Sequence, residues 1–249
     1  MSAILILKPD TLYAEILRQR LLTVYPGARI ESVATVGAAQ ERLQAARYDL
    51  LVTGVGPQLG GDVLDLLSAC QGTASRVRRS LVIASPNDYR ELSTLRLLGV
   101  PAVFDSSTES PEQFTAAVRA VADGKCYWSA SILAFMQRSR ATSNALFALL
   151  TNFEQVVLSV IGDGCDDVVA AEELGVTVAT VSAVRRGLHR KLGVQHRGEL
   201  VRVAAQQGFI RFTPAGVERP GFGLLRASYH GRRPKTAAAN EVAVGPSGK

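Results

Sequence analysis

Residues Leu150–Thr213 read LTNFEQVVLSVIGDGCDDVVAAEELGVTVATVSAVRRGLHRKLGVQHRGELVRVAAQQGFIRFT, and this stretch decides the fold of the C-terminal half. Apolar residues recur at helical spacing up to Gly162, and a second short apolar helix follows. After a glycine-containing turn, Thr177 or Thr180 can cap a third, cationic helix. This order is typical of a helix-turn-helix, whose last helix enters the DNA major groove. We therefore predict a small all-α DNA-binding domain over residues 149–213.

Acidic and basic residues occupy different parts of this segment. Residues 151–175 hold six acids and neither Lys nor Arg, whereas residues 176–211 hold seven bases and the single acid Glu199. Cations concentrated on one surface neutralise DNA phosphates. Residues three and four apart share a helix face, so part of the third helix should line the groove. The predicted DNA-binding residues are Thr180, Ser182, Arg185, Arg186, His189, Arg190 and Lys191.

Within this set the expected roles differ. Arg185 and Arg186 are the leading candidates for base contacts, because arginine pairs bidentately with guanine. Arg190 and Lys191 lie further along the helix, where contacts to phosphate are expected. Solvent exposure without base contact is about equally frequent for each arginine, and His189 is more often a neutral surface residue.

The same segment resembles the LuxR-type helix-turn-helix of bacterial response regulators. The matching landmarks are Leu150-Thr151, Glu154, Val157-Leu158, Gly164, Ala171, Leu174-Gly175-Val176, Thr180-Val181, Leu188, Lys191-Leu192-Gly193-Val194, Arg197 and Glu199-Leu200-Val201. The resemblance implies a four-helix domain that binds DNA as a dimer, with the helix 198–207 at the dimer contact. The chain departs from the family at Ser182 and Val184, where Lys and His are usual, and at 166–169, where Asp-Asp-Val-Val replaces Ser-Asn-Lys-Glu. Altered specificity and weaker affinity are therefore expected.

Residues 1–124 alternate short apolar runs with helical patterns. The run Ala3–Leu7 is apolar throughout, as in a strand buried on both faces. Further strands are expected at 29–33, 50–55, 81–84 and 102–104, with helices between them. Five strands alternating with five helices predict an α/β, flavodoxin-like domain with a five-stranded parallel sheet. This order resembles the receiver domain of response regulators, a common partner of the LuxR-type domain.

The residues at the strand ends do not fit receiver chemistry. Phosphoryl transfer to aspartate needs an acidic pair for Mg²⁺, a nucleophilic Asp, a hydroxyl and a Lys. The positions that correspond are Lys8, Pro9 and Asp10 after the first strand, Thr53 or Gly54 at the third, Ser85 at the fourth and Ser106 at the fifth. We therefore predict a degenerate receiver that is not phosphorylated on aspartate. Ser85 is interpreted as a turn cap, Asp10 as a helix cap and Asp49 as a strand-edge residue.

The remaining segments connect and extend these domains. Residues 125–148 are predicted to be a linker with a helix at 131–138 and a flexible joint at 138–143. Residues 214–249 are rich in Gly, Pro and Ala and carry net positive charge, which predicts a disordered basic tail. Three unpaired cysteines, no signal peptide and no apolar run near 18 residues predict a cytoplasmic protein without a membrane span.

Two function classes follow from these patterns. The first is a DNA-binding transcriptional regulator of response-regulator type, in a two-component setting but independent of aspartyl phosphorylation. It would act as a homodimer on a pseudo-palindromic double-stranded site and respond to a regulatory protein or small ligand. The dimer face would be the fourth helix, fifth strand and fifth helix (89–98 and 102–123). The alternative is an adaptor that hetero-dimerises with other regulators and binds DNA weakly. The sequence shows no nucleophile–base pair or metal cluster, so neither an enzyme nor a metal or other cofactor is expected.

Overall fold

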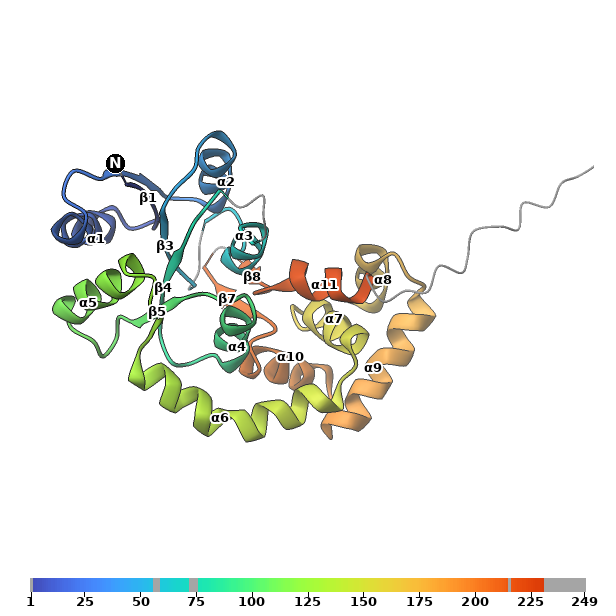
Figure 1. The fold of residues 1–249 in the computed structure, drawn as a ribbon. Coiled ribbons are helices and arrows are strands. Elements are labelled where there is room, and N and C mark those ends of the chain that lie inside the picture. The colour runs from blue at the N-terminus through green and yellow to red at the C-terminus, as the bar shows by residue number, and fades with distance from the viewer. Residues whose placement is uncertain (1, 56–58, 72–75, 215, 231–249) are drawn as a thin grey trace, which may run out of the picture.

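A computed structural model describes residues 2–55, 59–71, 76–214 and 216–230. Its N-terminal unit is built on one parallel sheet with the strand order β2-β1-β3-β4-β5-β6 (Figure 1). The strands are β1 (Ala3–Leu7), β2 (Arg29–Val33), β3 (Leu50–Gly54), β4 (Ser80–Ala84), β5 (Ala102–Asp105) and β6 (Tyr127–Trp128). The predicted fold class, an α/β domain followed by a helical one, is confirmed.

Helices cover both faces of this sheet. One face carries α1 (Thr11–Val24) and α5 (Pro111–Ala122), and the other carries α2 (Val36–Ala45), α3 (Val63–Ala69) and α4 (Tyr89–Leu97). Successive side chains of a strand point to opposite faces of the sheet, so β1 contributes side chains to two hydrophobic cores. Ile4 and Ile6 pack with the α1 and α5 side, whereas Leu5 and Leu7 pack with the other helices. Burial on both faces explains the continuous apolar runs in the sequence.

The sheet has a sixth strand, so the expected count of five is wrong. β6 pairs with the edge of β5 through the registers Ala102↔Tyr127 and Val103↔Trp128. Helix α6 (Ala130–Leu149) follows directly and packs against α4. Ile132 and Met136 of α6 are buried in the same core as α4. The start of the expected linker is thus part of the α/β unit, and the expected joint at 138–143 is continuous helix.

The helical unit contains α7 (Asn152–Ile161), α8 (Asp167–Leu174), α9 (Val178–Leu192) and α10 (Arg197–Gln206). Local signals set their ends. Thr151 and Glu154 form a capping box on α7, and Asp166 caps α8 by accepting from the backbone N–H groups of Val168 and Val169. Gly175 has the left-handed backbone, with φ 65°, that lets α8 end and the chain turn into α9.

The chain after α10 folds back onto both units. Strands β7 (Arg211–Thr213) and β8 (Gly216–Glu218) form an antiparallel hairpin, and α11 (Phe222–His230) follows. We call residues 211–230 the strap. The expectation of a disordered tail is wrong for 216–230, because this segment forms β8 and α11 and its larger apolar side chains are partly buried on the two cores: the Tyr229 ring stacks on Phe153 with centroids 4.7 Å apart. Composition alone missed these few large residues among Gly and Pro. Residues 231–249 lie outside the described part.

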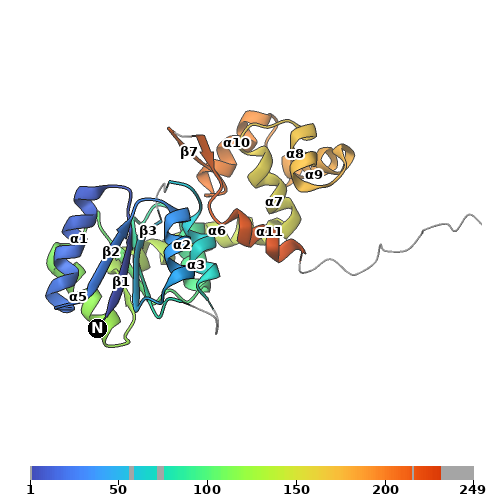
Figure 2. The same ribbon diagram turned by 90° about the horizontal axis from the view of Figure 1, so that it is seen from above.

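The strap lies between the two units. Figure 2 shows α11 running from the neighbourhood of α3 to that of α7, and α11 contacts both helices. Within the described residues, no helix is long and apolar enough to cross a membrane.

Candidate nucleic-acid interface

Helix α9 is held by its apolar side on the core of the helical unit. Val181 and Leu188 are fully buried there, and Val184 is partly buried, as the helical spacing predicted. Thr177 caps the helix by accepting from the backbone N–H of Thr180 at 3.2 Å. The opposite side of α9 faces solvent at the edge of the molecule, away from the α/β unit (Figure 1). It is therefore open to a groove-sized partner.

Arg185, a predicted base reader, is held within the protein. Its Nε and Nη2 atoms each lie 2.9 Å from a carboxylate oxygen of Asp167 at the start of α8. This is the two-pronged geometry in which arginine binds a carboxylate most strongly. The ion pair occupies the same edge of the guanidinium group that hydrogen bonds to guanine would require. The sequence held the signal, since Asp167 is one of the acids that depart from the LuxR pattern.

The end of α9 is also engaged. Lys191 donates to Glu154 Oε2 at 2.7 Å and to the carbonyl oxygen of Leu149 at 3.1 Å, which ties α9 to the start of α7. Burial alone would raise the pKa of Glu154, but hydrogen bonds from Lys191 and Thr151 hold it below its ordinary value. The Nδ1 atom of His189 lies 2.9 Å from the carbonyl oxygen of Val194. These two predicted DNA-binding residues therefore support the local fold in this structure.

Arg186 and Arg190 are exposed on α9 and are four residues apart, so they share one face. Ser182 is half-buried, and Thr180 is bonded through its hydroxyl to Thr177 at 2.8 Å. Of the predicted set, the two exposed arginines are the cations that α9 offers most directly to an anionic partner.

Replacing Asp167 with asparagine is expected to raise affinity for duplex DNA about fivefold at low salt. The change frees the guanidinium of Arg185 and removes a negative charge from the start of α8. Fluorescence anisotropy with a labelled duplex measures the effect, and Asp166→Ser, which keeps a cap on α8, is the control. Unchanged or weaker binding by Asp167→Asn would show that the pair orients α9 rather than restrains it.

The residues of the expected phosphorylation pocket gather at one edge of the sheet. The register pairs Leu7 with Thr53, Gly54 with Ile83 and Ala84 with Asp105, so the strand ends meet. Lys8, Pro9, Asp10, Thr53, Gly54, Ser85 and Ser106 lie at or next to these ends.

Their contacts are structural. Asp10 caps α1 by accepting from the backbone N–H of Tyr13 at 2.9 Å, and Asp49 accepts from the N–H of Ala3 at 2.9 Å. Lys8 Nζ lies 4.7 Å from the centre of the Tyr13 ring, and partial burial lowers its pKa. Thr53 is buried in β3 and donates to the carbonyl oxygen of Gly54 at 3.1 Å. The backbone carbonyl of Ser85 accepts from Asn87 at 2.9 Å in the following turn.

Asp105 ends β5, where a receiver would carry lysine, and is fully buried. Its carboxylate accepts from Thr108 at 2.7 Å and from the Ser131 hydroxyl of α6 at 2.6 Å, and from the backbone and hydroxyl of Ser107. Burial alone would raise the pKa of Asp105, but these donors hold it below its ordinary value. The acid thus fixes the start of α6 on the sheet, a role that the sequence did not reveal.

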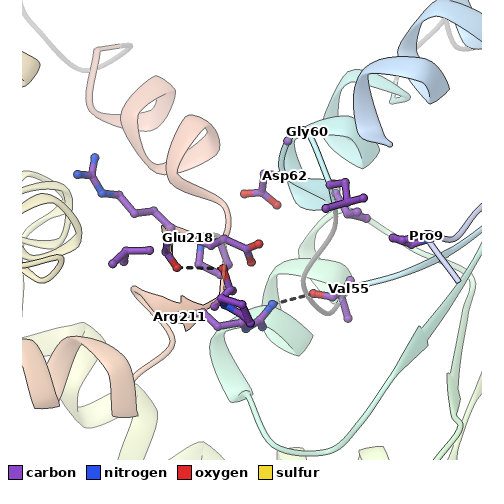
Figure 3. Close-up of a pocket in the computed structure, with 15 residues that line it drawn as sticks. Pro9, Val55, Gly60, Asp62, Arg211 and Glu218 are labelled. Carbon is purple, nitrogen blue, oxygen red and sulfur yellow. Dashed lines mark hydrogen bonds between the residues drawn. The ribbon is translucent and has the colours of Figure 1, made fainter. Parts of the chain in front are cut away.

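The hairpin of the strap covers part of the same sheet edge. Between them lies a cavity of about 640 Å³ lined by Pro9, Val55 and Val63 of the α/β unit and by Arg211 and Val217 of the strap. Figure 3 shows Arg211 reaching from β7 to the carbonyl oxygen of Val55 just beyond β3, a contact of 3.1 Å.

The second side of the junction is built around Arg90 of α4. Its Nη1 atom donates to the carbonyl oxygens of Gly208, at 3.0 Å, and Pro220. Its guanidinium lies 4.8 Å from the centre of the Phe209 ring. Arg90 is 9% exposed, and burial lowers its pKa. Arg90 belongs to the α/β unit but is therefore buried against the C-terminal unit, whose backbone carbonyl groups accept its hydrogen bonds.

Glu91, the next residue, is 5% exposed and accepts from Arg211 Nη2 at 2.9 Å. Burial raises its pKa from 4.5 to about 8, against the attraction of Arg211. A raised folded-state pKa contributes stability that is complete below the unfolded value and is lost as pH rises through the folded value.

We therefore expect the free energy of unfolding to fall as pH rises from about 4.5, the ordinary pKa, to about 8, the folded-state pKa of Glu91, and to level off above that. In Glu91→Gln, whose side chain cannot ionise, the free energy of unfolding should change less with pH over this range. Urea unfolding of both proteins at several pH values measures the difference. Parallel curves would assign the pH dependence to other groups, and Glu41→Gln on the exposed side of α2 serves as the control.

Comparisons with known proteins agree with this architecture. The transcriptional regulatory protein MctR of Rhizobium johnstonii is 28% identical over 185 residues, covering 73% of this chain and 84% of that protein. RcsB of Salmonella enterica serovar Typhimurium, solved on the promoter P1flhDC, matches with a TM-score of 0.55 at 17% identity, over 82% of this chain and 98% of that one. The RcsB response regulator of Salmonella typhimurium matches with a TM-score of 0.52 at 18% identity, over 82% and 100%. No protein-family model matches the chain.

Proposed function

We propose that this protein is a DNA-binding transcriptional regulator of response-regulator type. The observation that carries the proposal is α9, which lies on a helix-turn-helix core with Arg186 and Arg190 on its open face. Cations on a helix of groove-fitting dimensions are how such domains bind phosphates and base edges. The similarity to MctR and the RcsB fold supports this class. The function is thus assigned to binding and not to an enzymatic reaction.

The proposed working form is a homodimer on a pseudo-palindromic site. The face expected from receivers is partly covered by the chain itself, because α6 packs on α4 and β6 pairs with the edge of β5. The sequence could not show this, since β6 is only two residues long. We therefore place the dimer contact on α10, the helix that the LuxR resemblance implies, rather than on α4 and β5.

The proposed regulation does not use aspartyl phosphorylation. Thr53 and Gly54 stand where the acceptor belongs, and Asp105 replaces the lysine. Incubation with acetyl phosphate is expected to leave intact mass and DNA affinity unchanged, because no acid stands at the acceptor position and Asp105 occupies the position of the lysine. A stable addition of one phosphoryl group would contradict this prediction. A regulatory protein or small ligand acting at the cavity under the hairpin is the proposed alternative input.

The test is selection of genomic fragments by the purified, unphosphorylated protein at near-physiological salt. An Arg186→Ala/Arg190→Ala protein is the matched control, since both side chains are exposed and their loss spares the core. A shared dyad sequence recovered by the native protein alone supports the proposal. Recovery of no shared sequence by the native protein would refute it, whereas equal recovery of a dyad by both proteins would show that Arg186 and Arg190 do not carry the binding.

The second function, an adaptor with weak DNA binding, is favoured by one feature of α8. Val168 and Val169 are 59% and 49% exposed at its start, and Asp167 neutralises Arg185 beside them. A helix start that carries exposed apolar and acidic side chains is better suited to binding a protein than to binding DNA phosphates. Salt dependence separates the two: a regulator loses DNA affinity steeply as salt rises, whereas an adaptor shows little specific binding at any salt.

A further inference from the structure

The cavity between the sheet edge and the hairpin of the strap lies where parallel α/β sheets commonly bind ligands. The strand order places β2 on one side of β1 and β3 on the other, so the connections diverge between β1 and β3. Ligands of such sheets bind at this point, beyond the carboxyl ends of the strands. Pro9 follows β1, Val55 follows β3, and both line the cavity. The topology therefore favours a binding site here.

The size and lining of the cavity suit a small organic molecule. Its volume of about 640 Å³ lies within the range of roughly 300–1,000 Å³ that is typical of ligand pockets. The surface is mostly apolar, with Leu59 and Val63 on the side of the α/β unit and Pro214 and Pro220 on the strap. Leu59 is 53% exposed, so part of this apolar wall is open to solvent. A ligand with an apolar body would bury it.

Both arginines among the described lining residues are bound to acids of the protein itself. Arg211 donates to the carboxylate of Glu91 at 2.9 Å. Arg219 donates through its two Nη atoms to Asp163 and Glu173 of the helical unit. Because each guanidinium is already neutralised by a carboxylate, an anionic ligand would gain little from either of them.

Glu218 is a charged lining residue without such a partner. It pairs directly with Arg211 in the hairpin, and paired residues of neighbouring strands point to the same face. Arg211 reaches toward the α/β unit, so Glu218 faces the cavity as well (Figure 3). Its carboxylate accepts no hydrogen bond and forms no ion pair with any residue that the structure describes. Burial raises the pKa of Glu218, although Arg211 attracts its charged form. Glu218 is therefore a partly desolvated carboxylate with which a cation can pair.

A second carboxylate, that of Asp62, lies across the cavity from the hairpin (Figure 3). It accepts from the backbone N–H groups of Leu64, at 2.8 Å, and Gly221. These donors are neutral, and Asp62 forms no ion pair within the part of the chain that the structure describes. Clefts lined by one sign of charge concentrate ligands of the opposite sign. The charges of this cavity are therefore complementary to a cation.

We propose that this cavity binds a small molecule that combines an apolar body with one protonated amine, and that Glu218 receives the amine. The inference rests on the proposed function, because it names the chemical class of the small-ligand input. A charge-assisted hydrogen bond between the ammonium group and the carboxylate fixes the polar end of the ligand. The apolar walls, which come from both the α/β unit and the strap, cover the rest.

The first test is isothermal titration calorimetry of the full chain with three ligands that share one indole ring and one two-carbon arm. Tryptamine ends in an ammonium group, tryptophol in a hydroxyl and indole-3-propionate in a carboxylate. Tryptamine should bind about tenfold more tightly than tryptophol, and indole-3-propionate should bind most weakly. Nα-acetyl-lysinamide, which has the ammonium group without a ring, should bind at least about tenfold more weakly than tryptamine.

Three results of this titration would overturn the inference. They are equal affinities for the three indoles, equal affinities for tryptamine and Nα-acetyl-lysinamide, and no binding of tryptamine at about 1 mM.

The second test places the ligand in the cavity. Glu218→Gln keeps the shape of the side chain and removes its charge, so affinity for tryptamine should fall about tenfold and affinity for tryptophol less than about twofold. Glu112→Gln, which removes an exposed acid of α5, is the matched control for net charge and should bind both ligands as the native protein does. Leu59→Ala should weaken both ligands about threefold, because it removes part of the apolar wall.

Unchanged tryptamine binding in Glu218→Gln, or an equal loss in Glu112→Gln, would overturn the assignment to this cavity. None of these measurements uses DNA. A failed genomic selection would therefore refute the proposed function without touching the ligand site, and a failed titration would refute the site while DNA binding stands.

Discussion

Replacing Arg90, a buried cation, with alanine is expected to lower the free energy of unfolding by about 3 kcal/mol. Two carbonyl oxygens, those of Gly208 and Pro220, would lose a charged donor, and the Phe209 ring would lose the guanidinium that covers it. The lost desolvation cost of a buried cation offsets part of this, which keeps the figure below the sum of the contacts.

Urea unfolding followed by circular dichroism measures this effect. Arg90→Lys should recover part of the loss, because an ammonium group can donate to a carbonyl but lacks the planar fork. Arg96→Ala on the exposed side of α4 should change stability by less than about 0.5 kcal/mol. A loss in Arg90→Ala no larger than in Arg96→Ala would show that the junction does not stabilise the chain.

The parts of the fold that were predictable from sequence are those with local causes. The apolar run Ala3–Leu7 is a strand because its side chains feed both cores, and this is visible as an unbroken run. Thr151 with Glu154, three residues later, marks the start of α7 through a capping box. Such signals need no knowledge of distant residues.

The junction could not be predicted for the same reason. In the sequence, Arg90 looks like an ordinary cation on a helix. Its partners Gly208 and Pro220 lie more than 100 residues away and contribute only backbone atoms. The segment from residue 214 onward is predicted to be disordered because it is rich in Gly, Pro and Ala, although Phe222 and Tyr229 pack on the helical core. Pairing also changed the candidate site, since Asp167 took up Arg185. Residue type predicted the charge of the interface, but only the fold shows which charges are open.

The second large effect is on DNA binding and follows from the two exposed arginines of α9. The double replacement Arg186→Ala/Arg190→Ala should weaken binding to the selected operator about a hundredfold, at about 1–3 kcal/mol for each lost arginine contact. Both side chains are exposed on one face of α9, so the loss falls on the complex and not on the fold. The slope of log affinity against log salt should also become shallower, by about 0.9 for each phosphate contact removed.

Arg185→Ala provides the decisive contrast, because this side chain is bound to Asp167 in the free protein. Its loss should cost less than the loss of Arg186, since binding through Arg185 must first break a two-pronged ion pair. Arg226→Ala, an exposed cation on α11, controls for net charge alone. If Arg185→Ala weakens binding more than Arg186→Ala does, the arginine must leave Asp167 on the operator. The pair would then be a restraint released by DNA, and the Asp167→Asn protein, with Arg185 already free, should bind more tightly by the same interaction.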